Sequence, residues 1–404
     1  MNNELIACYQ VTEETRLMLR LALRERLPQA PEGIDWDTFR ETMDKHRIYP
    51  LVIRGLRQQD PGILKACPVL EKYRDRQGYY TMESFKRIRT LAEIAAAFDK
   101  EGIRMLSMKG PLLSMDLYGD PSMRHSRDLD LLVSEADYFG ACQCLLGLGF
   151  ERQENVHETT YLRSRLSLLY SDDKHTEFSR DGLSVELHWR GSIWYDLNVD
   201  QLWDRRETKL LMGTPVHQMG AMDEWPYLIS HAAVHGYMRL RWLLDLYELQ
   251  KDPRFRWEQM YEIMASRGHG AVLLETLLVL FRLEVLPMEP VETELFSLRR
   301  EGDGVRFAYA EELRRDAQDA IRFAQMVMPL MLVEKDMGSE LWYDYRRQLP
   351  MEEEKTPLWV KLVNIFRPEE VDYALIDLPD RWFWLYFLIR PVYWVWRKLT
   401  GGKK

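Results

Sequence analysis

The sequence predicts an α+β protein, in which a small mixed sheet is flanked by N-terminal and C-terminal helical regions. Apolar residues recur at helical spacing over the first and last parts of the chain, as in amphipathic helices. Between them, short apolar runs bounded by glycine, proline and polar residues are typical of strands. We therefore expect a helical region over 1–90, a sheet core over 91–220, a helical domain over 221–350 and an aromatic tail over 351–404.

Composition narrows the class of protein. Apolar residues make up 46% of the 404 residues, enough for a sizeable core, and the net charge of −9 disfavours a general nucleic-acid binder. The four cysteines lack zinc-site spacing, and the start of the chain lacks the features of a signal peptide. No uninterrupted run of about 20 apolar residues predicts a membrane-spanning helix. We expect a cytoplasmic protein.

The N-terminal region is expected to be helical throughout. Apolar spacing predicts helices over Thr15–Leu27 and Trp36–Leu56, with Asp35 as the N-cap of the second helix. A third helix is predicted over Glu83–Lys100, and the glycine at 102 ends its pattern.

The central region alternates between strands and helices. A short apolar run predicts a strand over Arg104–Met108, and Pro111 suits the first turn of a helix over Leu112–Tyr118. A second strand is predicted over Asp128–Val133 and a helix over Glu135–Leu148.

Three further strands are predicted over Tyr161–Leu169, His175–Ser179 and Leu183–Trp189. The last two flank Arg180-Asp181-Gly182, a sequence that favours a tight hairpin turn. The helical period then returns over Glu224–His235 and Leu240–Gln250, with more helices expected up to residue 345.

The C-terminal tail is unusually aromatic. Residues 382–396 are rich in Trp, Tyr and Phe, and Arg397 and Lys398 follow them directly. Arg390-Pro391 interrupts the segment, which is too short to span a bilayer. Such a segment suits peripheral contact with a membrane or a protein partner. Packing against the helical domain, or docking to a partner protein, is the alternative that we favour over lipid.

Asp128 and Asp130 are the first candidates for a catalytic site. Alternate side chains of a strand share a face, so the two carboxylates point the same way, roughly 6–7 Å apart at the backbone. Neighbouring carboxylates resist ionisation in an apolar setting, and a divalent cation removes that conflict. Mg²⁺, or Mn²⁺ in its place, accepts such ligands together with substrate phosphates. The competing interpretation is a solvent-exposed strand face.

Glu186 offers a third carboxylate. It alternates with Val185 and Leu187, so it faces the other way from these apolar residues. We predict that it lies on the strand next to Asp128–Val133, where three acids can hold two metal ions for displacement at phosphorus. Alone, Glu186 would be an ordinary surface residue. His188 shares its face and is a candidate for substrate contact, although a simple hydrogen-bonded histidine is commoner.

Four basic or turn residues are candidates for phosphate binding. Lys109 and Gly110 form a strand-to-helix turn, where a helix N-terminus and a lysine favour anions. Arg124 and Arg127 precede the predicted metal strand, and arginine forks suit phosphate oxygens. The alternatives are an ordinary turn and solvated charges.

The last candidates lie on the helices after the sheet. His231 and His235 share a helix face without other metal-ligand residues nearby, so we expect substrate contact or packing rather than zinc. Arg241 is also a candidate for substrate contact, and an ion pair with Asp245 is its structural alternative.

In combination, these motifs resemble a bacterial family described as uncharacterised nucleotidyltransferases, within the superfamily of DNA polymerase β and the aminoglycoside nucleotidyltransferases. The resemblance covers most of the chain and rests on an ordered set of motifs: Met108-Lys109-Gly110, Tyr118–Pro121, Arg124, Asp128–Val133, Glu186–Trp189, Leu228–Gly236 and Arg241–Asp245. The chain departs from the superfamily in having Lys-Gly at the turn, a longer spacing to Asp128 and Glu as the third acid.

The resemblance implies a Mg²⁺-dependent enzyme that moves a nucleotidyl group from an NTP to a hydroxyl or phosphate of an acceptor. Asp128, Asp130 and Glu186 would be its catalytic metal ligands. Because similar families accompany peptide natural-product and polysaccharide clusters, a modified peptide or glycan is the implied acceptor. Two alternatives stay open: transfer of a sugar or other phosphate-linked group from an activated nucleotide donor, and a catalytically silent nucleotide-binding module.

Overall fold

A computed structural model describes residues 2–153, 175–190, 197–283, 286–331 and 378–400, together with residues 366, 368 and 376. The predicted strand over Tyr161–Leu169 lies outside these residues. The described chain is an α+β protein with mixed sheets and helical flanks, as the sequence predicts. It divides into two units, of which the first comprises residues 1–90, 108–127 and 219–349, and the second comprises 91–107, 128–218 and 350–404.

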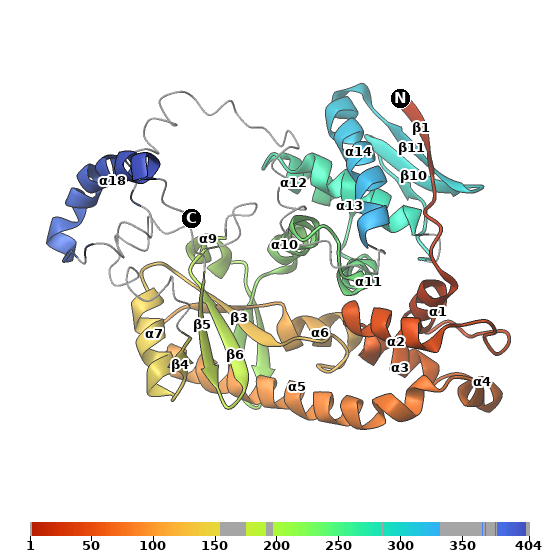
Figure 1. Cartoon of the computed structure of the whole chain (residues 1–404), viewed down its shortest axis with the longest axis horizontal. Helices are drawn as coiled ribbons and strands as arrows, with labels where there is room; N and C mark the ends of the chain where they lie inside the picture. Colours follow the sequence, from red (N-terminus) through yellow and green to blue (C-terminus); the bar gives the residue numbers. More distant parts are fainter. Residues whose placement is uncertain are drawn as a thin grey trace. The chain divides into compact units, whose positions relative to one another are not determined.

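The second unit is built on a seven-stranded mixed sheet, which contains the predicted central strands (Figure 1). The strand order is β4-β5-β6-β3-β2-β8-β7, with β3 and β6 parallel and with antiparallel hairpins at β5–β6 and β7–β8. The strands are β2 (Met105–Met108), β3 (Asp128–Val133), β4 (Glu151–Arg152), β5 (His175–Arg180), β6 (Leu183–His188), β7 (Glu207–Leu211) and β8 (Thr214–Gln218).

Local sequence explains the centre of this sheet. Leu129 and Leu131 of β3 are at most 1% exposed, as expected for the apolar side of an alternating strand. The β5–β6 turn forms at Asp181-Gly182, where both residues have positive φ values, of 51° and 74°. Helix α7 (Tyr138–Gly147) lies beside β4 (Figure 1), and α9 (Val199–Trp203) precedes the β7–β8 hairpin. The sequence did not predict that hairpin, because β7 begins with three consecutive polar residues, Glu207-Thr208-Lys209, and so lacks the alternation of a strand.

The helices of the first unit follow the predicted apolar spacing. Asp35 caps the second helix as expected, accepting hydrogen bonds from the backbone N–H groups of Asp37 and Thr38 at 3.0 and 3.1 Å. The helices are α1 (Glu13–Ala22), α2 (Trp36–Lys45), α3 (Tyr49–Leu56), α4 (Pro61–Ala66), α6 (Gly110–Tyr118), α10 (Ala221–Val234), α11 (Leu240–Leu249), α12 (Trp257–Ala265), α13 (Gly270–Arg282) and α14 (Arg314–Met331). The long helix α5 (Val69–Lys100) begins in this unit and ends in the other.

Three helix predictions were wrong in their bounds. The helix predicted over Thr15–Leu27 is α1, which ends at Ala22, and Arg24 beyond it has a positive φ of 63°. The segment Trp36–Leu56 is two helices, because Arg47 adopts a positive φ of 55° and Pro50 starts a new helix rather than continuing the old one. The helix predicted over Glu83–Lys100 is only the second half of α5.

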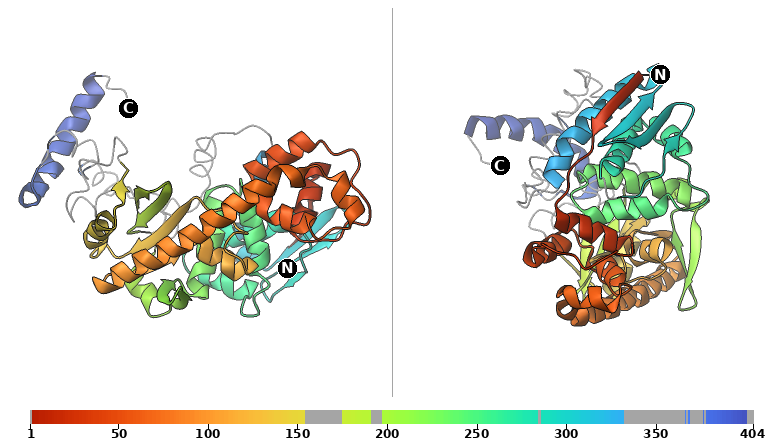
Figure 2. Two further views of the ribbon diagram at one scale, coloured as in Figure 1. Left: turned by 90° about the horizontal axis from the view of Figure 1, so that it is seen from below. Right: turned by 90° about the vertical axis from the view of Figure 1, so that its right-hand side faces the viewer.

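A second sheet, with strand order β1-β11-β10-β9, contradicts the all-helical prediction for the two ends of this unit. Strand β1 (Asn2–Ala7) pairs antiparallel with β11 (Gly304–Tyr309), and the right-hand view of Figure 2 shows them side by side. Strands β10 (Phe296–Glu301) and β9 (Val291–Glu292) complete the sheet. The buried residues Phe296 and Leu298 show the period of two that marks a strand, but the strong helical pattern on both sides obscured it.

His46 joins α2 to α11 within the first unit. Its Nδ1 accepts a hydrogen bond from the backbone N–H of Leu240 at 3.2 Å, and the residue is 1% exposed. Burial, followed by the charges of Lys45 and Arg239, lowers the pKa of His46 to about 3. His46 therefore holds this contact as a neutral acceptor.

Acidification is expected to weaken the fold at His46. Above pH 6.5, the ordinary pKa of histidine, His46 is neutral in both the folded and the unfolded state. Below pH 6.5, only the unfolded chain binds the proton, so the free energy of unfolding falls with pH until the pH reaches the folded-state pKa of about 3. At pH 5 this loss amounts to about 2 kcal/mol. His46→Asn keeps an acceptor, its Oδ1, but cannot titrate. Between pH 7 and pH 5, its free energy of unfolding, measured by chemical denaturation, should therefore fall by about 2 kcal/mol less than that of the wild type. An equal drop in both proteins would contradict this account.

The tail forms η2 (Asp380–Leu385) and α18 (Tyr386–Thr400). Among the described helices, none combines the length and the apolar character that crossing a membrane requires. Phe383 and Tyr386 are buried, whereas several large apolar side chains are exposed: Trp382, Trp384, Leu388, Val392, Val395 and Trp396. Packing of the tail against the helical domain stays a prediction, as does its contact with a membrane or partner.

Candidate functional site

Strands β3 and β6 bring two of the predicted acids together. Asp130 lies directly opposite Glu186 in the parallel register, and Asp128 lies opposite Ser184 two positions earlier. The prediction that Glu186 is on the strand next to Asp128–Val133 is therefore confirmed. Asp130 is only 6% exposed, so the alternative of a solvent-exposed strand face does not describe it.

His188 lies between the carboxylates of these two strands. Its Nε2 is 3.2 Å from Glu186 Oε2 and 3.4 Å from Asp130 Oδ1. Burial opposes ionisation of Glu186, but the hydrogen bond with His188 and the nearby imidazole of His175 outweigh it and lower the pKa of Glu186. Glu186 is therefore a carboxylate at neutral pH, the form that binds cations.

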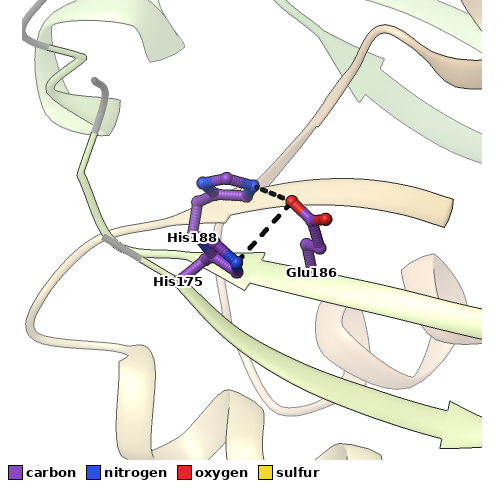
Figure 3. A group of neighbouring side chains, drawn as sticks. All are labelled: His175, Glu186 and His188. Atoms are coloured by element: carbon purple, nitrogen blue, oxygen red, sulfur yellow. Dashed lines mark hydrogen bonds and ion pairs between the residues drawn. The ribbon is translucent and has the colours of Figure 1, made fainter. Parts of the chain in front are cut away.

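His175 completes this group, although no motif in the sequence points to it. Its Nε2 lies 3.9 Å from Glu186 Oε2, and its ring centroid is 4.8 Å from that of His188 (Figure 3). His175 is the register partner of His188 across the β5–β6 hairpin. The predicted turn, Arg180-Asp181-Gly182, is one residue longer than the observed turn at Asp181-Gly182, and only the observed turn pairs these two histidines.

The surroundings of Glu186 are rich in carboxylates. Glu177 lies opposite it on β5, and burial together with the charges of Glu186 and Asp128 raises the pKa of Glu177. Strands β3, β5 and β6 thus gather carboxylates and imidazoles in one part of the sheet, and this donor set fits a divalent cation.

The model of a family described as uncharacterised nucleotidyltransferase matches residues 32–283. The chain belongs to this family. The matched region contains every site residue that the sequence predicts, from Lys109 to Arg241. No curated protein matches the chain.

Similarity to solved structures is weak. The solution structure of the antibiotic-resistance factor ANT(2'')-Ia is 12% identical, covers 46% of this chain and 92% of its own, and has a TM-score of 0.33. The crystal structure of an antigenic nucleotidyltransferase-like protein from Paracoccidioides brasiliensis is 14% identical, covers 46% of this chain and 91% of its own, and has a TM-score of 0.28. The family assignment rests on the family model.

In this nucleotidyltransferase-family chain, the Lys109-Gly110 turn has an unusual backbone. Lys109 is the N-cap residue of α6 with φ 51° and ψ −136°, and Gly110 follows with φ 59°. A positive φ is strained for lysine and is commonest at functional turns. The Lys109 ammonium lies 5.5 Å from the centroid of the Tyr227 ring, a cation–π distance.

Arg124 is neither a solvated charge nor an open phosphate fork. It is 3% exposed, and its Nε donates to Asp245 Oδ2 at 2.8 Å, while Tyr118 OH donates to Asp245 Oδ1 at 2.8 Å. Arg124 is therefore better interpreted as a residue that positions the segment before β3. Arg127, at the end of that segment, is exposed.

The structural alternative for Arg241, an ion pair with Asp245, was wrong: among the described residues, Asp245 forms its ion pair with Arg124. Arg241 donates instead to the backbone oxygen of His125. Burial and the charge of Arg124 lower the pKa of Arg241 to about 9. Arg241 and Asp245 are four residues apart on α11, and this spacing did not lead to an ion pair between them.

His231 and His235 form an aromatic cluster with Trp242. Their ring centroids are 4.7 Å apart, and those of His231 and His235 lie 5.4 and 5.2 Å from Trp242. Burial, and then the charge of Lys109, lowers the pKa of His231 well below its ordinary value. A neutral, ring-packed His231 fits the packing alternative rather than a charged contact.

The predicted site residues thus fall into two groups, one in each unit. Asp128, Asp130, Glu186 and His188 belong to the second unit, with His175 added. The first unit contains the remaining predicted residues: Lys109, Gly110, Arg124, Arg127, His231, His235 and Arg241.

Proposed function

We propose that this protein transfers a nucleotidyl group from an NTP to a hydroxyl or phosphate of an acceptor. The observation that supports this most is the register of β3 and β6, which sets Asp130 against Glu186 with Asp128 beside them. In a nucleotidyltransferase-family chain, this arrangement favours an enzyme, because a catalytically silent module has no need of a complete acid set. The DNA polymerase β-like superfamily is the proposed wider relationship.

Each acid has a proposed role. Asp128 and Asp130 bind the divalent cations and orient the triphosphate, and Glu186 completes the set and accepts the proton of the acceptor. When bound, Mg²⁺ or Mn²⁺ supplies neutralisation of the phosphate charge and a lower pKa for the acceptor hydroxyl. Lys109 and Gly110, at the N-terminus of α6, and the exposed Arg127 are proposed phosphate contacts.

The acceptor is proposed to be a modified peptide or a glycan in peptide natural-product or polysaccharide biosynthesis. This part of the proposal rests on the family resemblance. The same acids could instead serve transfer of a sugar from a nucleotide-sugar, so the donor must be tested directly.

Removal of the divalent ion gives the first test. We expect calorimetry to show NTP binding in the presence of Mg²⁺ or Mn²⁺ and at least about tenfold weaker binding with EDTA, because triphosphate and carboxylates repel each other without a cation. Equal affinity under both conditions would contradict the proposed site.

The transferred group is identified by mass spectrometry of peptide and glycan acceptors incubated with each NTP and each nucleotide-sugar. A mass gain of one nucleotidyl group, that is a nucleoside monophosphate less one water, with release of pyrophosphate, is the expected result. A gain of one hexosyl residue would show that a glycosyl group is transferred and would overturn the nucleotidyl assignment.

A further inference from the structure

We propose that His175, Glu186 and His188 bind a divalent transition-metal ion of the Zn²⁺ class, with Asp130 as the fourth ligand. Glu186 and Asp130 are shared with the proposed catalytic set, so the inference rests on the proposed function for the role of the ion in transfer. It does not rest on that function for the binding itself. The two imidazoles are what distinguishes this site from an all-oxygen magnesium site.

The topology of three strands places these side chains on one face. His175 and His188 are directly opposite each other in the β5–β6 hairpin, and Glu186 is two residues before His188. Asp130 is directly opposite Glu186 in the β3–β6 pair. Directly paired residues, and residues two apart in a strand, share a face, so all four side chains emerge on the same side of the sheet.

The donor atoms of His175, Glu186 and His188 are close enough together for one ion, and a carboxylate oxygen of Asp130 lies next to His188. One donor atom from each of His175, Glu186 and His188 lies within 4.8 Å of the other two. The closest separations from His188 Nε2 are 3.2 Å to Glu186 Oε2 and 3.4 Å to Asp130 Oδ1. Ligands held at about 2.1 Å from a tetrahedral Zn²⁺ are roughly 3.4 Å apart, so only small side-chain movements are required.

The scaffold around the donors is rigid. Thr176, the residue after His175, is fully buried and hydrogen-bonded to the Tyr138 hydroxyl at 2.7 Å, which fixes the start of β5 against α7. His188 is 6% exposed. Side chains on strands that are supported in this way form more precise metal sites than side chains on loops.

The chemistry of the donors favours a transition metal. Mg²⁺ prefers oxygen ligands in an octahedron, whereas imidazole nitrogen suits Zn²⁺, Fe²⁺, Ni²⁺ and Cu²⁺. Two imidazoles and two carboxylates carry a total charge of −2 when the imidazoles are neutral, which matches a divalent ion. Figure 3 shows both imidazoles directed at the same carboxylate oxygen of Glu186.

The test is calorimetry on the full-length, chelator-treated protein without nucleotide. We expect one Zn²⁺ per chain, bound at least about 100-fold more tightly than Mg²⁺, as the Irving–Williams order and the nitrogen donors require. Co²⁺ in place of Zn²⁺ should give a visible absorption band of a low-coordinate site. Zn²⁺ that binds no more tightly than Mg²⁺ would overturn the proposal.

Variants of the two histidines show whether they are ligands. His175→Ala is expected to weaken Zn²⁺ binding at least about tenfold and to alter the Co²⁺ band, with Mg²⁺ binding unchanged, since even loss of an outer-shell partner has an effect of this size. His175 is the first residue of β5 and its side chain is 26% exposed, so the variant should fold. His217→Ala is the matched control: it removes a histidine of the same sheet that is hydrogen-bonded to Thr208.

His188→Asn is the second variant, with folding checked by its thermal transition. Zn²⁺ affinity equal to wild type in both His175→Ala and His188→Asn would overturn the proposal. Measuring Mg²⁺-dependent NTP binding on the same preparations separates the two claims. If NTP binds but Zn²⁺ affinity is the same in the histidine variants as in the wild type, only this inference fails. If Zn²⁺ affinity depends on the histidines but NTP does not bind, only the proposed function fails.

Discussion

Asp130→Asn is expected to reduce nucleotidyl transfer by roughly 100- to 1000-fold or more, the range seen when one charge-stabilising group is removed from an active site. Asparagine has nearly the same shape, so the β3–β6 register should survive. What disappears is a buried negative charge, 6% exposed, opposite Glu186. Without this charge, the proposed site loses a carboxylate that binds the cation, and through the cation it orients the triphosphate less well.

The measurement is single-turnover pyrophosphate release at saturating NTP, with the thermal transition recorded for each protein. Asp181→Asn is the matched control, because it makes the same chemical change in the same sheet at the exposed β5–β6 turn. Asparagine tolerates the positive φ of 51° at that position. Full activity of Asp130→Asn, with an unchanged requirement for divalent ions, would show that the acids serve another purpose.

Local sequence was sufficient to predict the strand that bears this residue. Asp128–Val133 has the predicted bounds, because alternating polar and apolar residues are a short-range signal. The pairing of β3 with β6 is different in kind, since the paired residues Asp130 and Glu186 are 56 positions apart and no local pattern encodes their pairing. Alternation identified Glu186 as a carboxylate on a strand, and the order of motifs in the family that the chain resembles supported its place beside Asp128–Val133.

His175 was missed because the predicted turn was one residue too long. The sequence favoured a turn at Arg180-Asp181-Gly182, whereas Arg180 is paired with Leu183 and the turn is Asp181-Gly182. The length of a hairpin turn fixes every later pair of the hairpin. The predicted turn would set His175 opposite Leu187, and the observed turn sets it opposite His188.

Contacts between distant segments account for the other corrections. β1 pairs with β11 at the far end of the same unit, and a six-residue strand has too short a pattern to be separated from the helical region that follows. Arg124 and Asp245 are 121 residues apart, whereas Arg241 and Asp245 are neighbours on a helix. Sequence spacing therefore suggested Arg241 as the partner of Asp245, whereas the structure pairs Asp245 with Arg124.

That buried pair carries the largest stability effect that we expect. Arg124 and Asp245 are 3% and 2% exposed, and the Tyr118 hydroxyl donates a hydrogen bond to the second carboxylate oxygen of Asp245. Asp245→Ala leaves the guanidinium buried without its counter-charge and also removes the acceptor of Tyr118. Breaking a buried pair in this way lowers the free energy of unfolding by about 3–5 kcal/mol.

The backbone of Arg124 forms two hydrogen bonds that hold the segment before β3. Its N–H donates to Ser114 Oγ at 2.9 Å, and its carbonyl accepts from the Tyr80 hydroxyl at 2.8 Å. The segment that these bonds fix runs directly into Asp128, so Asp245→Ala should reduce nucleotidyl transfer as well as stability. Partial rescue by Asp245→Asn, which restores one of the two acceptor oxygens without the charge, would separate the two contributions.

Denaturation in urea measures the effect, and the exposed pair between Glu301 and Arg306 in the β10–β11 hairpin provides the control. Glu301→Ala removes a carboxylate from an arginine in the same unit, but solvent replaces it, so we expect no measurable change in stability. The replacement of both buried partners, Arg124→Met with Asp245→Leu, should recover most of the stability lost by Asp245→Ala, because no charge is then left unpaired. If Asp245→Ala unfolds at the same urea concentration as Glu301→Ala, the buried pair does not hold this segment, and Arg124 becomes available again as a phosphate contact.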